Sequence, residues 1–456
     1  MKQKLTLLTL SLLVAGWQVQ AAPQAASAPR QASAPAASAP AAAANSAATQ
    51  PVTAVGLPEI KASAYAVYDA QSGQMLASHK LNEHIEPASL TKLMTAYLVF
   101  KALEEGKLKP DQTFTVSEQG WKVEGSRMFL DPKTPARVDD LLKGLIVQSG
   151  NDASITLAEA VAGSEAQFVQ LMNAEAKRLG MKDTHFENST GLPGAQHYTS
   201  VQDLITLSAA IIHDYPQYYP LYSIQSYSYN NITQPNRNLL LYRDPDVDGM
   251  KTGHTDSAGY NLVASSKRNG RRVISVVVGT ESMQARAAES SKLLNWALQS
   301  YDTPKLYEAE TAISQVKVYK GADNAVNVGF IDATYITVPH GQAAQLQPVL
   351  ETVQPVLAPI SKGQVLGTVK FMDAQNRVVA QKDVVALNDV AEAGFFGRLF
   401  GRSSKPAEPQ ARPEFVVAVQ PRGNNASQLV LSNKDGSPYQ GADAQTWLSR
   451  LYNELR

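Results

Sequence analysis

No cysteine occurs among the 456 residues of the chain. Disulfide bonds, a thiolate nucleophile and a cysteine-based zinc site are therefore excluded. Lysine plus arginine equal aspartate plus glutamate at 41 each, so the net charge is zero and gives no reason to expect a nucleic-acid partner. The seven histidines show no HExxH or similar ligand spacing, and we expect no metal centre.

Long apolar runs are also scarce. The N-terminal run, residues 5–16, follows Lys2 and Lys4 and precedes a small-residue cleavage site at Ala21. Because this run is too short to span a bilayer, residues 1–21 are predicted to be a secretory signal peptide. We therefore expect an exported, periplasmic protein, with a retained membrane anchor as the alternative.

Composition divides the rest of the chain. Residues 22–56 are mostly Ala, Pro, Ser and Gln, which bury too little apolar surface to order the chain, so we expect a disordered spacer there. Hydrophobic patterning then begins. Hairpin signals at Ser72-Gly73 and Asn269-Gly270 lie on either side of a mostly helical stretch, residues 137–213. Residues 57–302 are therefore predicted to be an α+β domain whose terminal strands share one antiparallel sheet flanked by helices.

Between Tyr301 and residue 392 the sequence no longer shows helical spacing of apolar residues. Short β-rich runs separated by Gly, Asp, Asn and Pro predict a small all-β domain over residues 303–392. Residues 393–413 hold a short amphipathic stretch and a Pro-rich linker, and residues 414–456 form a C-terminal extension to which we assign no role. The amphipathic stretch predicts at most weak, peripheral contact with a membrane surface such as the inner membrane, through Phe395, Phe396, Leu399 and Phe400.

Ser89 and Lys92 stand three residues apart where an apolar helical pattern begins. Residues at this spacing share one helix face, so the hydroxyl and the amine can meet. A buried lysine loses proton affinity and can then take the serine proton. The alternative is a helix cap followed by a solvated lysine, and the spacing alone favours that alternative.

Two further stretches carry polar residues in settings that suit a binding cleft. Ser149 and Asn151 occupy a glycine-containing break between apolar helical segments. Lys251, Thr252 and Gly253 lead into the second hairpin, and the absent side chain of Gly253 would let a substrate backbone approach the strand. Each stretch alone also fits a purely structural role.

In this order, the three stretches match the S-x-x-K, S-x-N and K-T-G set of penicillin-binding proteins and serine β-lactamases. The chain resembles low-molecular-mass penicillin-binding proteins of the serine-type D-alanyl-D-alanine carboxypeptidase family. The segments "PASLTKLMTAY", "GSRMFL", "IVQSGNDA", "QPNRN", "VDGMKTGHTDSAGYNLVAS" and "GFFGR" carry that resemblance. It implies a β-lactamase/transpeptidase-like domain followed by a small all-β domain, with no metal or organic cofactor.

The resemblance also implies a role for each motif residue. Ser89 would be the acylated nucleophile, Lys92 its general base, and Ser149 a proton relay. Asn151 would hold the substrate peptide, and Lys251 would assist proton transfer and shape the field of the site.

Further positions would bind the reacting groups. The backbone N–H groups of Ser89 and His254 would form the oxyanion hole. Thr252 and Arg286 would bind the terminal carboxylate, for which the guanidinium fork is suited. For Arg286, a surface charge on a helix is the alternative reading.

The implied substrates are peptidoglycan stem peptides ending in D-Ala-D-Ala, and the implied inhibitors are β-lactams. A serine β-lactamase is an alternative, but no E-x-x-L-N type loop lies between the second and third motifs, although "FENST" in that stretch carries Glu187. A D,D-endopeptidase shares all three motifs. A non-catalytic peptidoglycan-binding protein would need to have lost a motif residue. His197 is expected to serve packing.

Overall fold

The computed structural model describes residues 56–394, 415–421 and 427–433. The predicted signal peptide, most of the spacer and the predicted membrane-contact residues lie outside these ranges. Within them, no helix is both long and apolar enough to cross a membrane.

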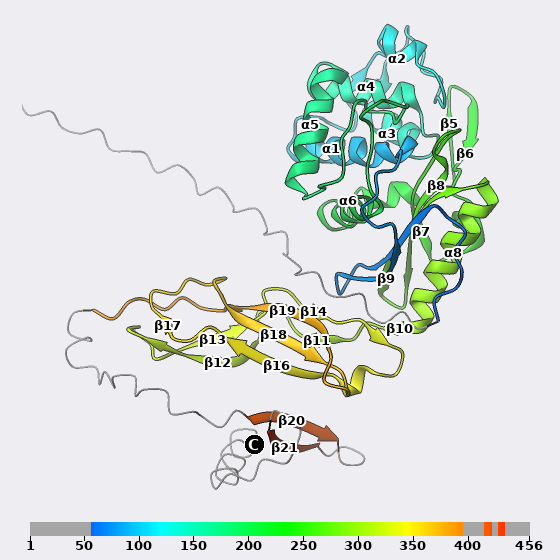
Figure 1. Cartoon of the computed structure of the whole chain (residues 1–456). Helices are drawn as coiled ribbons and strands as arrows, with labels where there is room; N and C mark the ends of the chain where they lie inside the picture. Colours follow the sequence, from blue (N-terminus) through cyan, green and yellow to red (C-terminus); the bar gives the residue numbers. More distant parts are fainter. Residues whose placement is uncertain (1–55, 395–414, 422–426, 434–456) are drawn as a thin grey trace, which may run out of the picture. The chain divides into compact units, whose positions relative to one another are not determined.

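A five-stranded antiparallel sheet organises the first domain (Figure 1). The strand order is β2-β1-β9-β8-β7, so the first two strands of the domain pair with the last three, as the sequence predicts. Asn269 and Gly270 have φ values of 51° and 82°, which fits the two-residue hairpin between β8 and β9. The strands are β1 (Ala64–Asp69), β2 (Gln74–His79), β7 (Val247–Thr255), β8 (Gly259–Arg268) and β9 (Arg271–Thr280).

Helices cover both faces of this sheet because its central strands are apolar on both sides. On β9, Ile274 and Val276 belong to one core, whereas Val273 and Val277 belong to the other. Helix α6 packs against β1 and β9, and α8 packs against β8 and β9 from the opposite face. The helices are α1 (Lys92–Glu104), α2 (Glu118–Lys122), α3 (Val138–Ile146), α4 (Asn151–Ala162), α5 (Glu165–Arg178), α6 (Val201–Asp214), α7 (Leu240–Arg243) and α8 (Met283–Ser300).

A short 3-10 helix, η1 (Ala88–Thr91), precedes α1 and contains Ser89. The α-helix therefore begins at Lys92, so Ser89 precedes it instead of lying within it. Two small two-stranded sheets complete this domain, and two further 3-10 helices occur along the described chain. These elements are β3 (Thr113–Phe114) with β4 (Ala136–Arg137), β5 (Ser226–Tyr229) with β6 (Ile232–Pro235), η2 (Tyr219–Ser223) and η3 (Ala343–Gln345).

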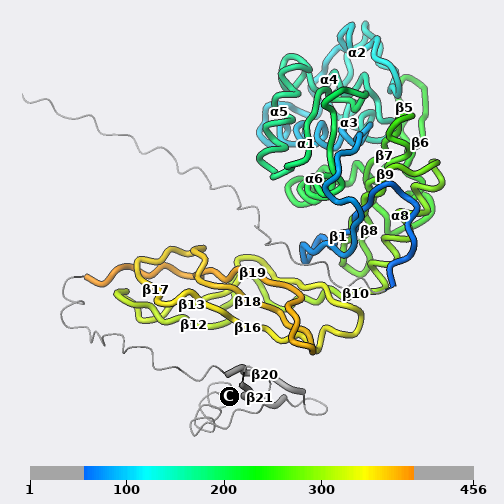
Figure 2. Tube along the Cα trace, viewed as in Figure 1, coloured from blue at the N-terminus to red at the C-terminus, as the bar shows by residue number. Residues whose placement is uncertain are grey.

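The second domain is all β, as predicted (Figure 2). Its six-stranded sheet has the order β16-β18-β19-β13-β12-β17 around a core that includes Val328, Val369 and Phe371. The strands are β10 (Tyr301–Asp302), β11 (Lys305–Tyr307), β12 (Ala312–Tyr319), β13 (Ala325–Gly329), β14 (Thr334–Tyr335), β15 (Val338–Pro339), β16 (Gln347–Thr352), β17 (Val356–Leu357), β18 (Val365–Met372) and β19 (Val378–Ala386). Strands β20 (Phe415–Pro421) and β21 (Ser427–Asn433) form a separate hairpin.

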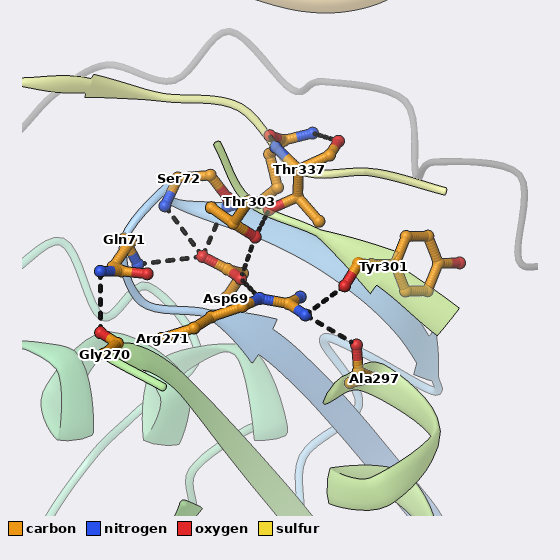
Figure 3. Close-up of polar contacts among 10 residues, drawn as sticks. Asp69, Gln71, Ser72, Gly270, Arg271, Ala297, Tyr301, Thr303 and Thr337 are labelled. Atoms are coloured by element: carbon orange, nitrogen blue, oxygen red, sulfur yellow. Dashed lines mark hydrogen bonds and ion pairs between the residues drawn. The ribbon is translucent and has the colours of Figure 1, made fainter. Parts of the chain in front are cut away.

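The β1–β2 turn is hydrogen-bonded to residues that follow α8 (Figure 3). Asp69, fully buried, accepts hydrogen bonds from Arg271 Nε and Thr303 Oγ1, each at 2.7 Å. Ser72 Oγ lies 2.6 Å from Thr337 Oγ1. The buried carboxylate thus has a charged partner and several donors, which offsets the cost of its burial.

Candidate active site

Ser89 and Lys92 meet in the structure. Lys92 Nζ lies 3.1 Å from Ser89 Oγ, and it is also 2.6 Å from both Asn151 Oδ1 and the Thr190 carbonyl oxygen. A neutral amine has two N–H donors and one lone pair. Because the two oxygen acceptors take both donors, the lone pair is left for the Ser89 hydroxyl proton. The arrangement is that of a nucleophile beside its base.

The surroundings of Lys92 favour its neutral form. Its side chain is only 1% exposed, and burial lowers its pKa to about 7. That value includes a smaller lowering by the positive charge of Arg237 and an opposing effect of the Asp152 carboxylate. A base with a pKa near neutrality is well matched to proton abstraction at physiological pH.

Ser149 and Lys251 form a second hydroxyl–amine pair. Lys251 Nζ lies 2.8 Å from Ser149 Oγ and 2.8 Å from the Thr252 carbonyl oxygen. Ser149 has a φ of 57°, within the break between α3 and α4. Burial, together with the charges of Lys92, Arg237 and Arg286, holds the pKa of Lys251 well below its usual value. The pair can therefore exchange a proton.

Asn151, the first residue of α4, connects Lys92 to a neighbouring segment. Its Nδ2 donates to the Glu124 carbonyl at 2.6 Å, and its backbone N–H donates to the Ser126 carbonyl at 2.7 Å. A Cβ on Gly125 would lie 2.9 Å from Asn151 Nδ2, so glycine permits this close approach. The amide is thereby fixed in orientation, with Oδ1 toward Lys92.

The same segment is held by the residue that follows Asn151. Asp152 is 1% exposed, and its carboxylate accepts hydrogen bonds from the backbone N–H groups of Met128, at 2.9 Å, and Leu130, at 3.1 Å. Together with the bond from the Asn151 N–H to Ser126, these contacts tie residues 124–130 to the start of α4. The segment forms a fixed wall beside the Ser149–Asn151 motif.

Strand β7 brings Lys251, Thr252 and Gly253 to η1, and the reason for the glycine differs from the one expected. A Cβ on Gly253 would lie 2.9 Å from the Pro87 carbonyl oxygen and 3.2 Å from the Leu90 nitrogen. The absent side chain therefore makes room for η1, which contains Ser89, and not for a substrate backbone as we expected from the sequence.

Arg286 is 3% exposed, so the alternative of a surface charge is wrong. It donates to the carbonyls of Gly253, at 3.2 Å, and Arg237, at 3.3 Å, and its guanidinium lies 5.5 Å from the ring centroid of Tyr260. Burial and the neighbouring charge of Arg237 lower the pKa of Arg286 to about 10. These contacts hold the Arg286 guanidinium beside strand β7 at Gly253.

Arg237 is a member of the site that the sequence reasoning did not single out. Its Nη1 donates to Ser126 Oγ at 2.6 Å, and its charge acts on Lys92, Lys251 and Arg286. The only signal in the sequence is its place in "QPNRN". With these basic side chains gathered around the two serines, the site suits an anionic ligand.

The side chains of His254 and Glu187 make contacts that do not involve Ser89 or Lys92. The exposed His254 ring stacks on Tyr260 with 3.9 Å between centroids, and its Nδ1 is 3.0 Å from the Gly259 carbonyl oxygen. Glu187 is exposed and accepts a hydrogen bond from the Gln196 N–H at 3.1 Å. The contacts of Glu187 lie within its own segment, and they give it no role beside Ser89.

Comparisons with known proteins identify the family of this chain. Residues 49–282 match the family described as D-alanyl-D-alanine carboxypeptidase, and residues 301–392 match the C-terminal domain of penicillin-binding protein 5. D-alanyl-D-alanine carboxypeptidase DacA of Haemophilus influenzae is 41% identical over 75% of this chain and 88% of its own length. DacC of Escherichia coli is 40% identical over 76% of this chain and 88% of its own length.

Solved structures show the same likeness. Penicillin-binding protein 5 from Haemophilus influenzae superposes with a TM-score of 0.71 at 40% identity, over 74% of this chain and all of that one. Penicillin-binding protein 6B from Escherichia coli gives a TM-score of 0.61 at 36% identity, over 73% of this chain and 97% of that one. The transpeptidase-like fold with an appended all-β domain is therefore confirmed.

Proposed function

Because this chain belongs to the D-alanyl-D-alanine carboxypeptidase family, it is a serine hydrolase, and we propose that Ser89 is the residue that carries the acyl group. The observation that supports this assignment is the position of Lys92 Nζ, 3.1 Å from Ser89 Oγ, with both amine hydrogens engaged by other acceptors. A hydroxyl with a neutral base beside it can attack a carbonyl carbon.

In the first half of the proposed reaction, Lys92 removes the proton of Ser89 as its oxygen attacks the carbonyl of the terminal D-Ala–D-Ala bond. The tetrahedral oxyanion is stabilised by the backbone N–H groups of Ser89 and His254. The proton reaches the leaving amine through Ser149, whose hydroxyl is 2.8 Å from Lys251 Nζ. Cleavage of the C–N bond then releases D-alanine and leaves an ester on Ser89.

In the second half, a water molecule attacks the ester, and Lys92, neutral again, takes the proton of that water. Attack by water restores the Ser89 hydroxyl and yields a stem peptide shortened by one residue. The buried pair Ser149–Lys251 and the low pKa of Lys92 support proton transfer in both directions.

We assign the binding of the substrate's terminal carboxylate to Thr252 and Arg286. The guanidinium is held by the carbonyls of Gly253 and Arg237, and the low exposure of Arg286 strengthens its attraction for an anion. Asn151 is assigned to the peptide backbone of the substrate, through an amide already oriented by Lys92 and Glu124.

Members of this family act on peptidoglycan peptides ending in D-Ala-D-Ala and bind β-lactams. For this chain we propose the same substrates and the same inhibitors. In a β-lactam the leaving nitrogen stays tethered to the acyl group, so the ester on Ser89 persists. We also propose that the protein is exported to the periplasm, with any contact at the inner membrane weak and peripheral.

Release of D-alanine from a synthetic pentapeptide ending in D-Ala-D-Ala tests the assignment. The wild-type protein is expected to release it, and Ser89→Ala is expected to reduce release to background. Ser257→Ala, which alters an exposed serine bonded to Glu86, is the matched control and should retain activity. Sustained release by Ser89→Ala would contradict the proposal.

A further inference from the structure

His197 is a buried histidine, outside the three motifs, that contacts the nucleophile turn. It is 4% exposed, and its Nε2 lies 2.8 Å from Thr91 Oγ1. Its Nδ1 accepts a hydrogen bond from the Glu187 N–H at 3.1 Å. Because a backbone N–H can only donate, Nδ1 must carry the lone pair. The ring is therefore neutral, with its proton on Nε2 donated to Thr91.

Thr91 lies in η1 between Ser89 and Lys92, and it is 1% exposed. The segment that carries His197, residues 187–197, also supplies the Thr190 carbonyl, which accepts one of the two Lys92 N–H bonds at 2.6 Å. One segment thus contacts the nucleophile turn through the His197 side chain and the catalytic amine through a backbone oxygen.

The backbone of this segment packs directly on η1. A Cβ on Gly191 would lie 1.8 Å from the Ala88 carbonyl oxygen and 2.9 Å from Thr91 Oγ1, so no other residue fits without displacement. Such close packing leaves the Thr190 carbonyl little freedom to move while this segment stays packed on η1.

Groups around His197 keep it neutral over the working pH range. Burial lowers its pKa to about 4, an effect opposed by the charges of Glu187 and Glu86 and assisted by that of His185. The ring also makes an edge-to-face contact with Phe186, with 5.8 Å between centroids. Above about pH 5 the imidazole therefore keeps the single tautomer that its two partners require.

We propose that His197 is a positioning residue for catalysis: it fastens residues 187–197 to η1, so that the Thr190 carbonyl holds one N–H of Lys92 and directs the amine lone pair at Ser89. The proposal rests on the roles of Ser89 and Lys92 given above. It assigns His197 no contact with the substrate and no part in proton transfer.

Loss of the His197 bond has a specific consequence for Lys92. If the segment moves from η1, the amine loses its Thr190 acceptor and water gains access to it. Burial is the main cause of the low pKa of Lys92, so hydration raises that pKa toward its ordinary value of 10.5. A smaller fraction of the amine is then unprotonated at neutral pH.

The test is the second-order rate constant for acylation by benzylpenicillin, measured from pH 5 to pH 10. In His197→Phe the ring contact with Phe186 is kept and both hydrogen bonds are lost. In the wild type the acylation rate rises with pH as Lys92 loses its proton, and we call this rise the acid limb of the profile. We expect the acid limb of His197→Phe to lie about one pH unit higher. This shift lowers the rate at pH 6 about tenfold and leaves the rate at pH 10 close to wild type.

His185→Gln is the matched control, because His185 is in the same part of the chain and its Nδ1 bonds the Gln196 carbonyl rather than η1. Its profile should coincide with that of the wild type. Thr91→Val removes the other partner of the His197 bond and should shift the limb in the same direction, which keeps the test open if His197→Phe does not fold.

Each result separates this proposal from the proposed function. A wild-type protein whose Ser89→Ala variant is still acylated would contradict the proposed function itself. If acylation depends on Ser89 but a folded His197→Phe or Thr91→Val keeps the wild-type limb, the positioning role is overturned. A uniform fall in rate with an unmoved limb would show a structural role only, and it would overturn the proposal as well.

Discussion

Lys92 Nζ lies within 2.6 Å of the Thr190 carbonyl oxygen, although the two residues are 98 positions apart in the chain. This contact, with those to Asn151 and Ser89, gives a buried lysine a complete set of partners in its neutral form. The chemistry of the site follows from that condition. With a pKa of about 7, a substantial fraction of Lys92 is unprotonated near neutral pH, and we propose that this amine activates the serine.

The rate of acylation should therefore rise with pH through about 7. Below that pKa Lys92 is protonated and cannot accept the Ser89 proton; above it the free amine is present. Stopped-flow acylation by a chromogenic cephalosporin measures the profile. Lys92→Met should lose about 10²- to 10⁴-fold in rate at pH 8 and show no limb near 7. If the acylation rate of Lys92→Met still rose with pH near 7, another group would be responsible for this pH dependence.

The same lowered pKa makes the stability of the wild type depend on pH. Between about 7 and 10.5 the unfolded chain binds a proton at Lys92 that the folded chain does not, so stability rises with pH across this window. Relative to Lys92→Met, the wild type should gain up to about 5 kcal/mol between pH 7 and pH 10.5. Urea unfolding at several pH values measures this difference. A difference that stays constant with pH would contradict the lowered pKa.

Arg286→Gln should weaken recognition of the terminal carboxylate. A charge-assisted hydrogen bond contributes about 1.5–3 kcal/mol, which corresponds to a loss of about 10- to 150-fold in kcat/KM. A substrate with an amidated C-terminus lacks the carboxylate and should be affected much less by the substitution. Arg243→Gln, at an exposed arginine of α7, is the control. Equal losses for the acid and the amide would argue against carboxylate binding by Arg286.

Asp69 connects the β1–β2 turn to Arg271 and Thr303 (Figure 3). Asp69→Ala leaves the mostly buried Arg271 guanidinium without its ion pair, and we expect a loss of about 3–5 kcal/mol in the free energy of unfolding. Asp246→Ala breaks the more exposed pair with Arg268 and should cost at most about 1 kcal/mol. Comparable losses for the two variants would show that burial of the Asp69 pair has no special effect.

Much of the fold could be predicted from local patterns. The turns at Ser72-Gly73 and Asn269-Gly270 marked hairpins, and strands at both ends of the domain indicated one shared sheet, which the structure confirms. Strand β16 was not predicted, because "QPVLET" contains a proline and too few alternating apolar residues to stand out.

The candidate site was found through its motifs, whereas the contacts that support it depend on tertiary packing. Nothing near Thr190 in the sequence shows that its carbonyl meets Lys92, and a single histidine such as His197 does not reveal its partners. Gly253 illustrates the same point. Its position suggested a passage for substrate, but the backbone of Pro87 and Leu90 fills that space, and only the folded chain shows this.

The most direct test of the central claim is the intact mass of the mature protein after treatment with benzylpenicillin, followed over time and mapped to a peptide. We expect a persistent adduct, one per chain, on the peptide that contains Ser89, and no adduct in Ser89→Ala. A brief adduct with rapid turnover of the antibiotic would indicate a β-lactamase instead. An adduct on another residue, or none, would contradict the assignment of Ser89 as the nucleophile.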